Sequence, residues 1–134
     1  MMISKLAAIA ALTLLAGAAK AACTYPAAPD KIPDGSTATR DEMLAAKQAV
    51  AKYNDEITAY QSCIKLESDG SIAELEKQAK TDEEKKAFAA QKAELERKLV
   101  ERNNAALDEV TAVVERFNEQ LRAYNKKNPP GSTK

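Results

Sequence analysis

The segment from Thr39 to Ile64, TRDEMLAAKQAVAKYNDEITAYQSCI, decides the fold. Its apolar residues recur at alternating steps of three and four, at Met43, Ala46, Val50, Tyr53, Ile57, Tyr60 and Ile64. This seven-residue repeat puts them in one stripe along a helix and is typical of a coiled coil. Thr39 and Glu42 fit a capping box, which predicts that the helix begins there. A single apolar stripe must be buried against a partner, so at least one further helix is expected.

The next segment predicts an interruption. Ser68-Asp69-Gly70 is expected to end the first helix, because glycine commonly follows a helix terminus. Two further capping boxes follow, Ser71 to Glu74 and Thr81 to Glu84. They allow two arrangements, either a short helix over 72–80 followed by a long one, or a single helix that bends near Thr81.

Beyond Thr81 there is no proline or glycine until Pro129, so one long helix is expected. Its apolar stripe advances in alternating steps of seven and four, an eleven-residue repeat that stays on one face of a nearly straight helix. The stripe comprises Phe88, Leu95, Leu99, Ala106, Val110, Phe117 and Leu121. Asn103-Asn104 is the expected site of any internal bend, and residues 128–134 are expected to form a disordered tail. The predicted fold is all-α, with residues 39–127 forming an antiparallel helical hairpin or a small three-helix bundle.

Residues 1–21 have the parts of an export signal. Lys5 is followed by an apolar run over 6–16, and Ala19-Lys20-Ala21 fits an A-x-A cleavage site. The apolar run is too short for a membrane span of about 20 residues. A cleaved signal peptide and a periplasmic location are therefore predicted, with the mature chain beginning at Ala22.

Residues 22–38 contain three prolines, which exclude a helix and predict an extended N-terminal strap. An exported chain with an even cysteine count is expected to pair Cys23 with Cys63. A redox-active pair is disfavoured by the long separation, and an intermolecular bond stays open. Acylation of Cys23, as in a lipoprotein, is disfavoured by Lys20, which stands where lipoprotein signals usually carry leucine.

The composition predicts a non-enzymatic protein without cofactor or metal. The 134 residues contain no histidine, the commonest general base and metal ligand, and no glycine-rich phosphate loop. Loss of residues 1–21 would leave 18 basic and 20 acidic residues, a balance that does not favour nucleic acid. No second apolar run is long enough to span a membrane.

The remaining functional hypothesis is a protein–protein contact along an apolar helix face. The last helix, at about 69 Å, is expected to outrun the first, at about 44 Å. The excess would leave a stripe without an intramolecular partner. These candidate partner-binding residues are Val110, Val114, Phe117, Leu121 and Tyr124. The partner would be another protein or a second copy. The alternatives are an envelope-stress chaperone or holdase, and a membrane lipoprotein acylated at Cys23.

A set of spaced residues completes the pattern: Cys23, Pro26, Ile32-Pro33-Asp34-Gly35, Thr39, Met43, Tyr53, Tyr60 and Cys63, with the later Phe117-Asn118 and Tyr124. In these residues the chain resembles a group of small exported proteins of Gram-negative bacteria. The resemblance covers most of the chain after residue 22. It implies a periplasmic location and no activity, so no residue takes a functional role from it.

Overall fold

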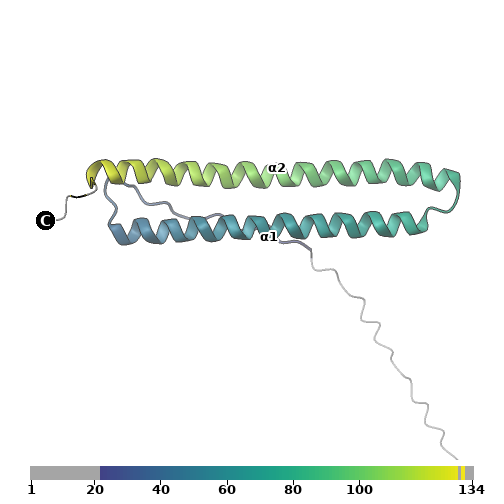
Figure 1. Ribbon diagram of the computed structural model, residues 1–134, viewed down its shortest axis with the longest axis horizontal. Helices are drawn as coiled ribbons and strands as arrows, with labels where there is room; N and C mark the ends of the chain where they lie inside the picture. The colour runs from purple at the N-terminus through teal and green to yellow at the C-terminus, as the bar shows by residue number, and fades with distance from the viewer. Residues whose placement is uncertain (1–21, 130, 132–134) are drawn as a thin grey trace, which may run out of the picture.

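The computed structural model describes residues 22–129 and 131. The predicted signal peptide, residues 1–21, lies outside the described residues, as does most of the predicted tail. Two long helices, α1 (Arg40–Gln78) and α2 (Asp82–Lys127), run antiparallel as a hairpin (Figure 1). The prediction of an all-α hairpin is confirmed. The three-helix alternative is wrong, because the described residues form two helices.

Both helices begin where capping boxes predicted. The Thr39 and Thr81 side chains accept hydrogen bonds from the backbone N–H groups of Glu42 and Glu84. In return, Glu42 accepts from the Thr39 N–H at 2.7 Å and Glu84 from the Thr81 N–H at 2.8 Å. These backbone hydrogen bonds lower the pKa of both glutamates. Four orphan N–H groups of the two helix starts are thereby satisfied within the chain.

The predicted helix end at Ser68-Asp69-Gly70 is wrong, because α1 continues through Gly70 to Gln78. A glycine inside a helix costs only about 1 kcal/mol. The seam spacing continues past it to Leu75, so a break would forfeit contacts with α2. Ser71 caps nothing, and its hydroxyl donates instead to the Glu67 carbonyl at 2.9 Å. The chain reverses just beyond, over 79–81, before the predicted start of α2.

The core is a single cluster along the facing stripes of the two helices. The predicted α1 stripe is confirmed, since all seven residues from Met43 to Ile64 are buried. The buried residues of α2 are Ala106, Val110, Val113 and Phe117. Val113 was missed because it falls between the steps of the eleven-residue repeat. The helix is continuous through Asn103-Asn104.

The strap, residues 22–38, is extended and lies along the hairpin from its open end to about its middle (Figure 1). The predicted disulfide closes its far end, with the Cys23 and Cys63 Cα atoms 5.8 Å apart. At the near end, Gly35 is buried against α2. A Cβ at Gly35 would lie 1.8 Å from the Gln120 carbonyl oxygen, so only glycine permits this approach. The strap is therefore fixed at both ends.

We expect the double variant Cys23→Ser/Cys63→Ser to lose about 4 kcal/mol of unfolding free energy, the chain-entropy value for a loop of this length. Urea denaturation followed by circular dichroism at 222 nm measures the loss. Ser62→Ala, beside the bond on the exposed side of α1, is the control and should stay within about 0.5 kcal/mol of the parent. A double variant as stable as the parent would contradict a structural role for the bond.

Candidate protein-binding groove

The stripe predicted to bind a partner lies in the covered half of the hairpin. Val110 and Phe117 are buried, and Val114, Leu121 and Tyr124 are partly buried against the same core. The expectation that they lack an intramolecular partner is wrong. Because the chain reverses over 79–81, this part of α2 packs against the first half of α1 and the strap. The uncovered apolar surface is therefore at the other end of the hairpin.

A polar cluster marks the place where the strap ends. The Tyr25 ring of the strap packs edge-on against Tyr60, with 4.9 Å between the ring centroids. The Tyr25 hydroxyl donates to Glu109 of α2 at 2.5 Å. On the other side of Tyr60, Arg102 donates to its hydroxyl at 3.1 Å and also to Glu67. This cluster links the strap to both helices.

Tyr25 of this cluster and the nearby Tyr53 both have a raised pKa. Partial desolvation of its ring against the helices, followed by the hydrogen bond to Glu109, raises the pKa of Tyr25 above its ordinary value of 10. Burial likewise raises the pKa of Tyr53, which is 1% exposed and whose hydroxyl makes no hydrogen bond of standard geometry. A phenol with a raised pKa favours folding at neutral pH and loses that effect only in alkali above pH 10.

Past this cluster, the groove between the helices continues without a strap. Full burial stops at Ser68 in α1 and begins only at Ala106 in α2. From here to the hairpin turn lie three adjoining hollows. The first and second share Leu95 as a lining residue, and the second and third share Leu75 and Gln91. We call this surface the open groove. Its apolar lining consists of Ile64, Leu75, Phe88, Leu95 and Leu99.

The largest side chains of the open groove are only partly covered. Leu75, Leu95 and Leu99 are half-buried, although each lies on the seam between the helices. Ile64, at the boundary with the covered half, is 0% exposed. Two helices can cover only the surfaces that face each other, and beyond Ile64 the described residues supply no third layer. The open groove is thus the part of the seam that the fold leaves unfinished.

One polar group inside the open groove has no partner. Ser68 lines the first hollow and is 8% exposed, yet its Oγ makes no hydrogen bond among the described residues. A buried hydroxyl without a partner costs about 1–3 kcal/mol. The neighbouring serines behave differently, since Ser62 and Ser71 each donate to the carbonyl four residues earlier. Ser68 is therefore the unsatisfied polar group of this surface.

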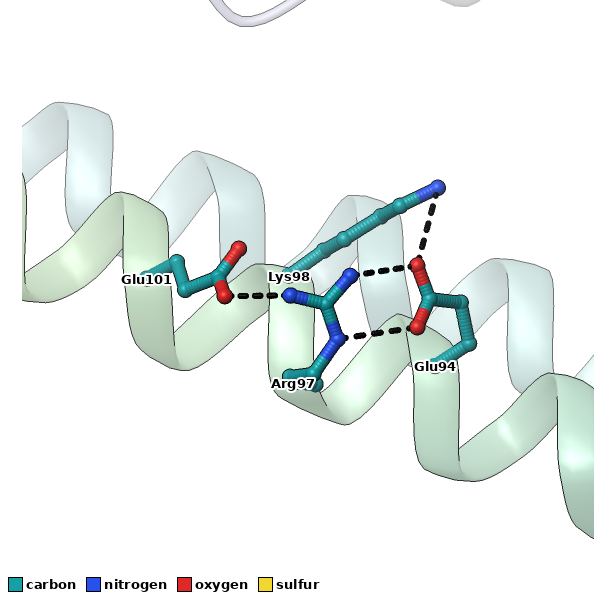
Figure 2. A network of polar contacts seen from close by, with 4 residues as sticks. All are labelled: Glu94, Arg97, Lys98 and Glu101. Carbon is teal, nitrogen blue, oxygen red and sulfur yellow. Dashed lines mark hydrogen bonds and ion pairs between the residues drawn. The ribbon is translucent and has the colours of Figure 1, made fainter.

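Glu94, Lys98 and Glu101, which line these hollows, form a network of charges with Arg97 (Figure 2). Arg97 donates to both oxygens of Glu94, at 2.7 and 2.9 Å, and also pairs with Glu101. Lys98 lies 3.5 Å from Glu94. The hydrogen bonds from Arg97 lower the pKa of Glu94 to about 2, so this carboxylate stays ionised in all but strong acid. Because these side chains are exposed, the network adds little to stability, but its charges are already paired.

The geometry defines a class, a disulfide-stapled helical hairpin with a half-covered seam. No protein-family model matches the sequence, and no curated protein or solved structure matches it either. Within the described residues, no group of acidic, cysteine or histidine side chains is arranged to hold a metal ion, and no helix is apolar enough over a sufficient length to cross a membrane.

Sequence reasoning missed the open groove because it placed a helix end inside it. The apolar residues of the groove were recognised in the sequence, since Phe88, Leu95 and Leu99 belong to the predicted stripe. Ile72 and Leu75 continue the α1 seam at steps of three or four after Ser68. That spacing is the signal that the helix continues past Gly70, and it outweighs the cost of one glycine.

We expect Ser68→Ala to raise the unfolding free energy by about 1 kcal/mol, because it removes a buried hydroxyl that has no partner. Urea denaturation of the disulfide-bonded chain measures the change. Ser62→Ala serves as the matched control, since it brings the same gain in helix propensity at an exposed, hydrogen-bonded serine. If Ser68→Ala were less stable than this control, the Ser68 hydroxyl would have to be bonded in solution.

Proposed function

We propose that this chain is a non-enzymatic periplasmic protein that acts by binding another protein along an apolar helix face, and that the open groove is the binding surface. The observation that carries the proposal is the half-covered seam at Leu75, Leu95 and Leu99, beside a covered half built from the same helices. Contiguous apolar surface on a small domain usually marks an interaction site.

The proposed location rests on two features. The disulfide is typical of proteins that fold in an oxidising compartment. The sequence over 1–21 has the charged start, apolar run and small-residue site of an export signal. A lipoprotein would use the same sulfur atom, because its thioether and the disulfide both require Cys23 Sγ. The intact bond and acylation at Cys23 therefore exclude each other.

The intact mass of the native protein, measured without reductant, tests the location and the bond together. We expect the mass of residues 22–134, 113 residues, less two hydrogens. A mass increased by acyl chains would instead identify the lipoprotein, with Cys63 free. A doubled mass that collapses on reduction would identify a covalent dimer.

The binding surface is tested by cross-linking in the native cell envelope with the photoreactive residue p-benzoylphenylalanine. Placed at Ala90, an exposed residue that lines the open groove, it should give a discrete cross-linked product on irradiation. Placed at Ala51, an equally small and exposed residue of α1 outside every hollow, it should give none. Circular dichroism of both variants controls for folding.

The products of the Ala90 variant separate the candidate functions. A single product with another protein supports the proposal, and a product of twice the chain mass makes the partner a second copy. A ladder of many products would favour the holdase, which binds diverse unfolded clients. Cross-linking that is equal from Ala90 and Ala51, or absent from both, would overturn the proposed binding surface.

A further inference from the structure

The strap shows what kind of segment the seam between the two helices can hold. It crosses the covered half as an extended chain, with Ala28 and Ile32 packed against the core and Tyr25 against Tyr60. The α1 surface beneath Ile32 is made of small residues, Ala45, Ala46 and Ala49. Small residues leave room for a third segment to lie close to the helix backbones. The covered half is therefore built to accept an extended segment with small and single large side chains.

The helices also hold the backbone of the strap. The Gly35 N–H donates to the Gln120 side-chain oxygen at 2.9 Å, and the Ser36 carbonyl accepts from Lys127. Gly35 and Ser36 both lie in the turn at the near end of the strap, so helical side chains here supply hydrogen bonds to main-chain groups that the turn leaves free. This matters because a main-chain group that lost water without gaining a partner would oppose docking.

The open groove continues the covered half along the same line. Arg102 lines the first hollow and bonds Tyr60, the residue against which Tyr25 of the strap packs. Small side chains also line the open groove, at Ser68 and Ser71 of α1 and at Ala87 and Ala90 of α2, among larger apolar and charged ones. The first hollow measures about 290 Å³, at the lower end of the range for small-molecule sites. It fits one large side chain, as Tyr25 and Ile32 supply in the covered half.

The unpartnered Ser68 hydroxyl adds a requirement on the occupant. Ser68 is more than nine-tenths buried and its side chain lines the first hollow, so a rotation of the hydroxyl toward the hollow would let a segment lying there bond it. A helix offers it no backbone group, since the N–H and C=O groups of a helix are bonded internally. An extended segment has free N–H and C=O groups at every residue. The charges of the network around Arg97 are already paired, so an uncharged segment suffices.

From these features we infer that the open groove binds an extended segment of a partner protein, with one aromatic or branched apolar side chain among small residues and a main-chain hydrogen bond to Ser68. The inference rests on the proposed function and names its ligand class. A second copy of the hairpin, which would present helices, is the competing occupant.

A peptide with the strap sequence provides the probe. Residues 22–35 with Cys23→Ser, labelled with fluorescein, are titrated with the disulfide-bonded protein, whose covered half is occupied by its own strap. Fluorescence anisotropy should show saturable binding. Leu95→Gln should weaken it at least tenfold and Ser68→Ala several-fold, whereas Leu66→Gln should stay within twofold. Leu66 is 74% exposed and lines none of the three hollows of the open groove. The control therefore makes the same leucine-to-glutamine change at a site outside the groove.

Other results would overturn the inference. Absence of saturable binding, or equal binding by the parent and Leu95→Gln, means that the groove does not take extended segments. A concentration-dependent dimer in sedimentation equilibrium that Leu95→Gln dissociates assigns the groove to a second copy. If Leu95→Gln does not fold, the comparison between the parent and Ser68→Ala still tests the inference. If the peptide fails while the Ala90 cross-link still captures a discrete protein, the proposed function stands and only the ligand class falls.

Discussion

The bond between Cys23 and Cys63 is the constraint on which the arrangement of this protein depends. The strap that it holds forms no helix or strand, and its ordering costs about 1–2 kcal/mol per residue in backbone entropy. The contacts that repay this cost are few, mainly those of Tyr25, Ala28 and Ile32. Fixing the end of the strap to α1 lowers the entropy that these contacts must overcome. Without the bond, the third layer over the hairpin would have only the turn at Gly35 as a firm anchor.

The division of the hairpin into two halves follows from where the strap ends. Two helices bury the stripes that face each other and leave the flanks of the seam exposed. In the covered half the strap closes one flank, and residues such as Tyr53 and Ile57 lose almost all contact with solvent. Past Cys63 the same two helices, with the same seam spacing, reach only partial burial at Leu75 and Leu95. Burial continues past the end of the strap only as far as Ile64, Ser68 and Ala106, so the strap contributes to the difference between a core and a groove in this molecule.

Local signals in the sequence predicted most of the fold. The α1 stripe, the capping boxes at Thr39 and Thr81 and the disulfide are set by spacing within one segment or by the cysteine count, and the structure bears them out, whereas the capping box predicted at Ser71 does not form. The helix end predicted at Gly70 was wrong because the glycine is a local signal. The packing of Leu75 that overrides this signal depends on α2, which is far away in the chain. From that error came the wrong position of the uncovered stripe. A prediction that a residue is exposed depends on every segment that covers it, and the stripe around Phe117 is covered by two.

The charges around the open groove bear on what can bind there. Glu94, Arg97, Lys98 and Glu101 satisfy one another, and Arg102 is shared between Tyr60 and Glu67. A ligand that neutralised one of these groups would have to break an existing pair, so charge contributes little to selection. Discrimination is left to shape and to the polar group within the groove. A segment that fills the space beside Leu95 and Leu99 without bonding Ser68 leaves the free-energy cost of the buried hydroxyl in place. A segment that also forms a hydrogen bond with Ser68 removes that cost. The same serine that destabilises the free hairpin would therefore favour the bound one, which gives a physical reason for a polar residue at a seam position where alanine would fold better.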